Sequence, residues 1–297
     1  MPCGYILVVN PLAMLKTAGA LVVLISMISA EPARAELRNN VEYGRAGGTS
    51  LLLDADIPHG RGPFPAAIIV HGGAWVTGDR RYNVEPLFHP LTEAGFAWFS
   101  ISYRLAENAA VFGDAIQDVQ QAIRYVRAHA AEYRIDPNRI ALIGESAGAQ
   151  LAAMAALDGD KSPVRAVVSL YGPTDLVSLA RTSKQIPESL RRSVQGTPFE
   201  SLLLAGLAQL SPINHVRADM PPFLLIHGTS DALVPFEQSV SFYEKARQAG
   251  AHCDLYPVNG GGHGILWWDA DHLTSYKQHM VNWLEKQLDV RPSRARA

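Results

Sequence analysis

A glycine-flanked serine stands where a strand pattern changes into a helix pattern, in Gly144-Glu145-Ser146-Ala147-Gly148. Residues 140–143 before it form a short apolar run, and residues 149–157 after it are rich in Ala and Leu. A tight bend needs neighbours with little or no side chain, which the glycines supply. Such a bend exposes the serine hydroxyl above a sheet, and the unpaired N–H groups and positive dipole end of the helix lie behind it. The stretch has the G-x-S-x-G pattern of a nucleophile elbow.

Short apolar runs alternate with longer helical patterns along most of the chain. The nearly continuous apolar character of the runs is typical of a parallel sheet covered on both faces. Strands are predicted at residues 66–70, 97–103, 140–143, 166–170, 223–227 and 253–258, after an antiparallel entry pair at 41–43 and 50–54. Helices are predicted at residues 85–94, 114–133, 147–157, 236–249 and 275–288, with turn chemistry at Asp136-Pro137 ending the second. The sequence therefore predicts an α/β fold with a doubly wound, mostly parallel, eight-stranded sheet.

One long segment, residues 173–222, breaks this alternation because it is helix-rich and irregular. We predict that it is an insertion after the sixth strand. It would lie over the carboxyl edge of the sheet, where ligands bind in open α/β folds. A separate small domain is the alternative, which the small number of apolar residues in the segment disfavours.

Composition limits the class of protein. The 297 residues are 48% hydrophobic and 18% charged, which suits a globular chain with one large or two small domains. The formal net charge is −2, so no basic field favours nucleic acid as a partner. H-E-x-x-H, EF-hand and G-x-G-x-x-G patterns are missing from the sequence, so neither a metal nor a cofactor is expected.

The N-terminus predicts an export signal. Residues 18–28 are an apolar run of signal-peptide length, and Ala33-Arg34-Ala35 fits a cleavage site. We expect residues 1–35 to be removed, with Met14 as a candidate initiator, and the mature chain to be periplasmic or secreted without a stable membrane anchor. An uncleaved anchor is the alternative. The folded domain would span residues 36–290, and a disordered tail 291–297.

Cysteine usage is sparse. Cys3 lies in the expected leader, which leaves Cys253 alone in the mature chain. No intramolecular disulfide is therefore expected, and stability has to come from the core.

Two further polar residues follow late strands. A serine hydroxyl is a poor nucleophile until a base takes its proton. Asp231 comes just after the strand at 223–227, and His263 comes just after the strand at 253–258. The carboxyl ends of parallel strands meet at one edge of a sheet, so Ser146, Asp231 and His263 are expected to converge. In this arrangement the imidazole is the base and the carboxylate holds its tautomer.

A glycine loop follows the strand at 66–70, in His71-Gly72-Gly73-Ala74-Trp75. Backbone N–H groups from such a loop, together with the N–H after the nucleophile, can form an oxyanion hole. We predict that the N–H groups of Gly73, Ala74 and Ala147 do so.

Other candidates near the site have more than one interpretation. Trp75, Glu145 and Trp267 are candidate pocket residues, although the two tryptophans could be core residues and Glu145 could make a buried polar contact. Asp254 and Asp269 compete for the role of the acid. Asp254 lies inside a strand pattern, and Asp269 lies after the histidine, so both are weaker candidates than Asp231.

The elbow, the acid, the histidine and the glycine loop together resemble the α/β-hydrolase superfamily. The closer likeness is to its esterase branch with an H-G-G loop, which includes feruloyl-type and hormone-sensitive-lipase-like esterases. It covers about residues 41–288, including residues 136–140 and 231–235. Hormone-sensitive-lipase-like enzymes have a third glycine where this chain has Ala74-Trp75. The H-G-G-x-W pattern is more similar to feruloyl-type esterases and kynurenine formamidases.

The resemblance implies a catalytic assignment, with Ser146 as nucleophile, His263 as base and Asp231 as its orienting acid. Together with the expected leader, it implies an exported serine carboxylesterase acting on esters of small acyl or aromatic acids, with a small-molecule ester as its partner. A formamidase or peptidase of the same fold is the main alternative, and an inactive binding module is a further one. The segment 173–222 shows no strongly apolar amphipathic lid, which disfavours a long-chain lipase.

Overall fold

The computed structural model describes residues 36–106, 112–158, 164–183, 189, 192–193 and 195–290. These residues belong to one compact unit. The expected signal peptide and the expected C-terminal tail lie outside the described residues. In the described part of the chain, none of the helices is long and apolar enough to cross a membrane.

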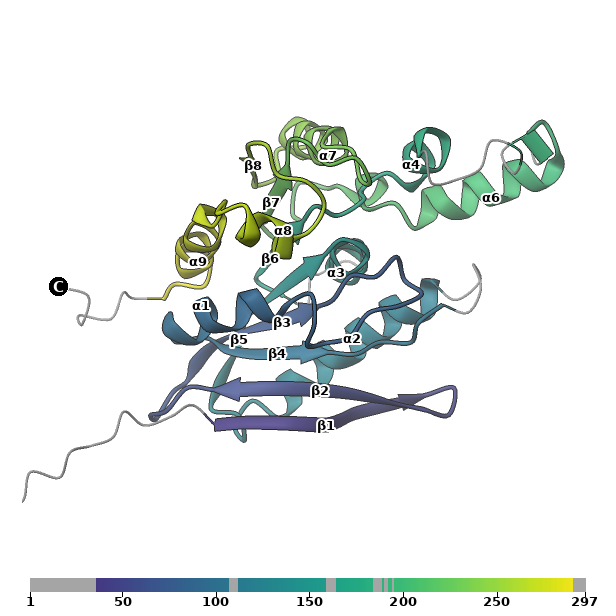
Figure 1. Ribbon diagram of the computed structural model, residues 1–297. Coiled ribbons are helices and arrows are strands. Elements are labelled where there is room, and N and C mark those ends of the chain that lie inside the picture. The colour runs from purple at the N-terminus through teal and green to yellow at the C-terminus, as the bar shows by residue number, and fades with distance from the viewer. Residues whose placement is uncertain are drawn as a thin grey trace, which may run out of the picture. The chain divides into compact units, whose positions relative to one another are not determined.

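Within the described residues, eight strands form one sheet in the order β1-β2-β4-β3-β5-β6-β7-β8 (Figure 1). The first two strands pair antiparallel, β2 is antiparallel to β4, and the strands from β4 to β8 along this order are parallel. The bounds are β1 Glu36–Ala46, β2 Thr49–Ile57, β3 Phe64–Val70, β4 Ala97–Ile101, β5 Ile135–Glu145, β6 Ala166–Leu170, β7 Phe223–Gly228 and β8 Cys253–Val258. The predicted doubly wound, mostly parallel eight-stranded sheet is confirmed.

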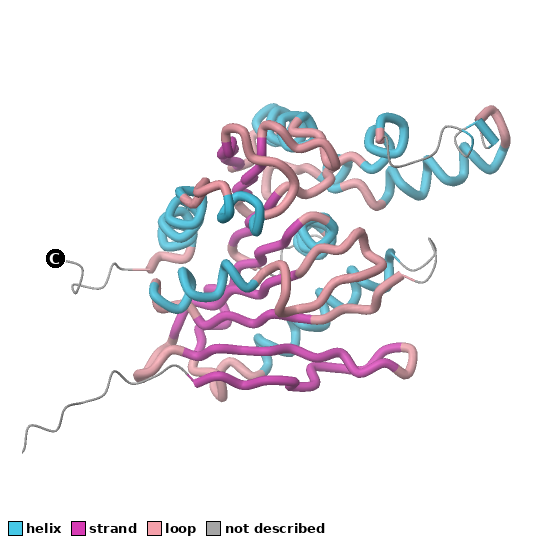
Figure 2. Tube along the Cα trace, in the orientation of Figure 1, coloured by secondary structure: helices cyan, strands magenta, loops and turns pink. Residues whose placement is uncertain are grey.

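Helices lie on both sides of this sheet (Figure 2). One face packs against α2 (Phe112–Ala128), α3 (Ala147–Leu157) and α7 (Glu237–Gln248). The other packs against η1 (Glu85–Leu87), α1 (Phe88–Glu93), α8 (Ile265–Ala270) and α9 (Ser275–Gln287). Neighbouring strand residues belong to opposite cores, as Ile68 and Ile69 do. Burial on both faces is the reason that the strands read as unbroken apolar runs.

The predicted boundary between the second helix and the next strand is wrong. The helix expected at residues 114–133 ends at Ala128, and the next strand already begins at Ile135. Asp136-Pro137 therefore lies inside β5 and does not end the helix. The turn that this pair predicts does form, but within the strand: the Asn138 N–H donates to Asp136 Oδ1 at 2.9 Å. The register with β3 shifts between Ile135 and Ile140, which accommodates this turn within the strand.

The segment between β6 and β7 holds α4 (Leu176–Thr182), α6 (Pro198–Gln209) and η3 (Pro212–His215). Asp175 caps α4 and Thr197 caps α6, each accepting a bond from a backbone N–H three residues on. The start of the segment is tied to α7, since the Thr174 N–H donates to Gln238 Oε1 at 3.0 Å. In Figure 1, α6 extends away from the sheet, and it has no buried residue.

Candidate active site

Ser146 occupies the bend between β5 and α3. Its backbone has φ 53° and ψ −118°, and its N–H donates to the carbonyl of Leu170 at 2.9 Å. A side chain at Gly144 would overlap the backbone of Ala149, and one at Gly148 would overlap carbonyls at the end of β3. A non-glycine residue at positive φ persists only where its surroundings hold it. The close packing permitted by the two glycines provides that support.

Three side chains form an unbroken hydrogen-bonded row. Ser146 Oγ lies 2.8 Å from His263 Nε2, and His263 Nδ1 lies 2.7 Å from Asp231 Oδ2. An ionised carboxylate can only accept, so Nδ1 carries the proton of the neutral imidazole. This leaves Nε2 as an acceptor for the serine hydroxyl. The structure thus brings together the three residues that the sequence predicted to converge.

The loops that carry Asp231 and His263 are tied to each other. The Ser230 N–H donates to the carbonyl of Gly261 at 2.9 Å, and the Gly260 N–H donates to Thr229 Oγ1 at 2.9 Å. These bonds fix the loop after β8 against the loop after β7. The acid and the imidazole are therefore aligned by the backbone as well as by their own contact.

Asp231 accepts hydrogen bonds from other groups besides the imidazole of His263. Its Oδ1 accepts from the N–H groups of Leu233 and Val234, both at 2.9 Å. His227 Nε2 donates to the Val234 carbonyl at 2.9 Å and lies 3.3 Å from Asp231 Oδ2. Burial acts to raise the pKa of Asp231, but the bonds from His227 and His263 outweigh it and hold the pKa below its ordinary value. The acid therefore stays ionised near neutral pH.

The competing carboxylates have other partners. Asp254 Oδ2 accepts from Trp283 Nε1 at 2.7 Å, and Asp269 Oδ2 pairs with Lys277 Nζ at 2.6 Å. Both contacts link the carboxylate to α9, so Asp254 and Asp269 each have a structural role away from Ser146.

The glycine loop after β3 has an unusual backbone. The φ angles are 117° at Gly73, 52° at Ala74 and 65° at Trp75. A side chain at Gly73 would overlap the carbonyl of Thr77. Among the described residues, the N–H groups of Gly73, Ala74 and Ala147 take part in none of the turn or loop hydrogen bonds. They are therefore available to a ligand oxygen.

Glu145 links this loop to the histidine. It is buried, and it accepts from the Gly72 N–H at 2.6 Å and from the Tyr171 hydroxyl at 3.0 Å. The same hydroxyl accepts from the Ile265 N–H at 3.0 Å, and the Tyr171 ring packs edge-on against His263. Burial raises the pKa of Glu145 above its ordinary value, although both hydrogen bonds favour the charged form.

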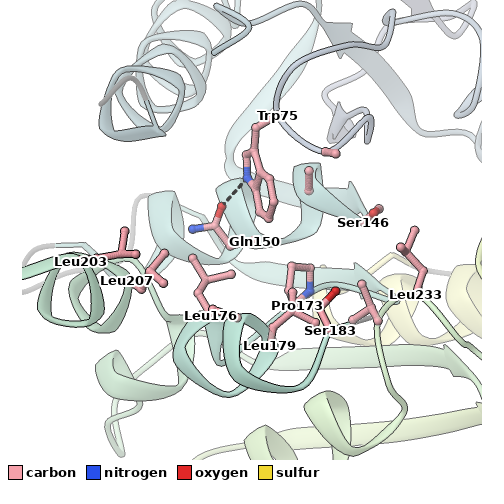
Figure 3. Close-up of a pocket in the computed structure, with 14 residues that line it drawn as sticks. Trp75, Ser146, Gln150, Pro173, Leu176, Leu179, Ser183, Leu203, Leu207 and Leu233 are labelled. Carbon is pink, nitrogen blue, oxygen red and sulfur yellow. Dashed lines mark hydrogen bonds between the residues drawn. The ribbon is translucent and has the colours of Figure 1, made fainter. Parts of the chain in front are cut away.

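Two cavities meet at Ser146. The first has a volume of about 480 Å³ and is strongly apolar (Figure 3). Its lining is Ala74, Trp75, Ser146, Ala147, Gln150, Pro173, Leu176, Leu179, Ala180, Ser183, Leu203, Leu207, Leu233 and Val234. The second has a volume of about 350 Å³ and is lined by Gly73, Ala74, Thr77, Asn83, Glu145, Ser146, Tyr171, Leu233, His263, Gly264, Ile265, Leu266 and Trp267. The three predicted pocket residues all line a cavity, Trp75 the first, Glu145 and Trp267 the second.

Gln150 is a site residue that the sequence analysis did not identify. It lies one turn after Ser146 on α3 and is 1% exposed. Its Oε1 accepts from Trp75 Nε1 at 2.9 Å, and its Nε2 donates to the Leu210 carbonyl at 2.8 Å. One amide thus joins the glycine loop to the end of α6.

We expect Gln150→Leu to destabilise the protein. The substitution removes both bonds at once and leaves the Trp75 indole N–H and the Leu210 carbonyl without this partner. An unsatisfied buried polar group costs about 1–3 kcal/mol, so the free energy of unfolding should fall by about that amount or more. Urea unfolding measures it, and Gln120→Leu, which removes an exposed hydrogen bond to Asp158, is the matched control. Equal stability of the two variants would contradict the proposed link.

In the described part of the chain, no group of three or more His, Cys, Asp or Glu side chains could hold a metal ion.

Comparisons with known proteins give a family and several ester-hydrolysing relatives. The model of the BD-FAE family matches residues 53–246. A probable carboxylic ester hydrolase, LipM of Mycobacterium tuberculosis, is 34% identical over 72% of this chain and 52% of its own length. A probable isoprenylcysteine alpha-carbonyl methylesterase of Arabidopsis thaliana is 30% identical over 77% of this chain and 51% of its own. The chain spans about half the length of the curated relatives it matches.

Solved structures cover the chain more fully. A truncated carbohydrate esterase from gut microbiota matches with a TM-score of 0.72 and 32% identity, over 88% of this chain and 99% of that one. A thermophilic esterase from Thermogutta terrifontis matches with a TM-score of 0.70 and 25% identity, over 89% and 96% of the two chains. The expected α/β-hydrolase esterase fold is confirmed.

Proposed function

This chain belongs to the BD-FAE family, and on that premise we propose that it is a serine esterase that cleaves esters of small acyl or aromatic acids. The observation that carries the proposal is the row of Ser146, His263 and Asp231, with contacts of 2.8 and 2.7 Å, at the meeting point of two cavities. The ester-hydrolysing relatives support the type of bond.

In the proposed reaction His263 removes the hydroxyl proton as Ser146 attacks the ester carbonyl. Asp231 stabilises the imidazolium that forms and does not itself take the proton. The imidazolium then gives its proton to the departing alcohol oxygen, which leaves an acyl group on the serine. Water, activated by the same imidazole, releases the acid and restores the hydroxyl.

The negative oxygen of the tetrahedral intermediate would lie against the N–H groups of Gly73, Ala74 and Ala147. Removal of a single such donor in other enzymes costs about 10²–10³ in turnover. The strained backbone at Ala74 supports this role, because such conformations gather where function requires them.

Labelling by a fluorophosphonate tests the proposal. We expect covalent modification of the wild-type chain at Ser146 and none in Ser146→Ala. Initial rates on acetyl, butyryl and feruloyl esters, measured beside N-formylkynurenine, then separate an esterase from a formamidase. A chain that is neither labelled nor active on any ester would be an inactive binding module.

We also propose that the protein is exported. Residues 1–35 would be the cleaved leader, by the pattern of an apolar run followed by Ala33-Arg34-Ala35. N-terminal sequencing of the protein from fractionated cells should give Glu36 in the exported fraction. An N-terminus that retains the apolar run, in a membrane fraction, would contradict cleavage.

A further inference from the structure

We propose that the apolar cavity beside Ser146 is an acyl pocket that favours unbranched aliphatic chains over hydroxylated aromatic acyl groups, and that α6 sets its length. The inference rests on the proposed ester hydrolysis, and it narrows the substrate class. Three observations carry it: the position of the imidazole, the chemistry of the cavity wall and the arrangement of the leucines of α4 and α6.

The position of His263 assigns a side of the ester to each cavity. The base must pass its proton to the leaving alcohol oxygen, so the alcohol leaves on the side of the imidazole. His263 lines the second cavity and is not part of the lining of the first. Ser146 and Ala74 line both, which places the scissile carbonyl between them. The acyl group therefore extends into the first cavity.

The wall of that cavity offers little to a polar acyl group. Leucines supply most of its side-chain bulk, from α4, α6 and the loop after β7. Gln150 is its buried amide, and both ends of that amide are already bonded, to Trp75 and to Leu210. Ser183, a hydroxyl-bearing residue of this wall, also has an interaction partner already. A phenolic hydroxyl placed here would lose its bonds to water without regaining them, whereas each buried methylene is favourable.

The leucines of α4 and α6 follow one another along the cavity, away from the serine. In Figure 3, Ser146 lies at one end, Leu176 and Leu179 of α4 lie between, and Leu203 and Leu207 of α6 lie at the other end. A short acyl group would reach only the wall near the serine. A longer chain would reach α6, so substitutions there should change chain-length preference.

A series of p-nitrophenyl esters tests the preference. From acetate through butyrate to hexanoate we expect kcat/KM to rise by about fourfold for each methylene that becomes buried. With the alcohol held constant, methyl hexanoate should be cleaved at least tenfold more efficiently than methyl ferulate. A steady fall in kcat/KM from acetate onward, or a preference for ferulate, would overturn the inference.

Two tryptophan variants on the same helix test the role of α6. Leu207→Trp places bulk at the far end of the cavity, whereas Leu202→Trp places the same bulk at a position that is 71% exposed and does not line it. The ratio of hexanoate to acetate kcat/KM should fall at least tenfold in Leu207→Trp and stay unchanged in Leu202→Trp. An equal ratio in both variants would remove α6 from the acyl pocket.

Failure of this inference can be told apart from failure of the proposed function. If acetate is cleaved and the fluorophosphonate labels Ser146, but chain length has no effect, the esterase stands and the acyl pocket is wrong. If no ester is cleaved and no label forms, both are wrong.

Discussion

Ser146→Ala should lower kcat for ester hydrolysis by about 10⁶-fold, which is the size of loss found when the nucleophile of a well-studied serine hydrolase is removed. The hydroxyl is the atom that His263 Nε2 contacts at 2.8 Å, and alanine leaves the imidazole without a group to activate. The fold should be unaffected, because the Ser146 side chain caps no backbone N–H of α3. Alanine tolerates the positive φ about as well as serine does.

Initial rates with p-nitrophenyl butyrate measure the loss, and thermal unfolding checks that the variant is folded. Ser275→Ala is the matched control. Its hydroxyl is exposed and contacts the Tyr256 hydroxyl, and both residues lie far from the elbow in the sequence. We expect the control to keep its full rate. A Ser146→Ala protein with a rate near that of the wild type would show that another group attacks the ester.

The parallel part of the fold could be predicted from the sequence because each strand is buried on both sides. The strands at 166–170 and 253–258 and the helix at 147–157 have the bounds that the apolar runs predicted. Once the strands are parallel, their carboxyl ends meet at one edge. That single consequence of topology brings Asp231 and His263 to Ser146. The two residues follow Ser146 by 85 and 117 positions in the chain, a separation over which no local sequence pattern predicts contact.

Strand β5 shows what local patterns cannot predict. It begins at Ile135, before the Asp-Pro pair that predicted a turn. The turn bond at Asp136 exists, yet pairing with β3 resumes at Ile140 and the segment still counts as strand. Tertiary pairing decides the boundary, and the local turn residue does not.

The supporting residues of the site depend on partners far away in sequence. Gln150 could have been identified from the sequence. It is a polar residue in the Ala- and Leu-rich helix at 147–157, and its amide needs a hydrogen-bond partner once that helix is buried. Tyr171 and His227 gave no such signal, because apolar strands end in many kinds of residue. Only the structure shows that His227 approaches Asp231 at 3.3 Å and that Tyr171 contacts Glu145 at 3.0 Å.

The contribution of α6 to the cavity could not be predicted from the sequence either. The segment 173–222 showed no amphipathic lid, because the leucines of α6 do not gather in one stripe and none is buried. Leu203 and Leu207 nevertheless line the apolar cavity. A half-exposed pocket wall has no periodic burial pattern, so sequence periodicity could not identify it.

Asp231→Asn should lower kcat by about 10⁴-fold, the loss found for the equivalent change in a well-studied serine hydrolase. The carboxylate accepts from His263 and from the N–H groups of Leu233 and Val234, with His227 close by. An amide has one acceptor oxygen, so its NH₂ group must face one of these donors. If it faces His263, the imidazole takes the other tautomer and Nε2 can no longer accept the serine proton.

The same change at two other carboxylates distinguishes the acid from its neighbours in sequence. Asp254→Asn and Asp269→Asn disturb contacts to Trp283 and Lys277, so turnover should stay within about threefold of the wild type, in line with the small net energy of partly exposed pairs. Turnover that survives in Asp231→Asn and is lost in Asp269→Asn would assign the acid to Asp269.

Stability at low pH gives a second readout for Asp231. Its pKa in the folded protein is below the ordinary value, because the bonds from His227 and His263 outweigh the effect of burial. The stabilisation is therefore complete above the unfolded pKa of about 3.9 and is lost as the pH falls toward the lower folded value. Asp231→Asn has no carboxylate to protonate here. Its Tm should therefore fall less than that of the wild type between pH 7 and pH 3, and an equal fall would mean that the carboxylate is not held by these bonds.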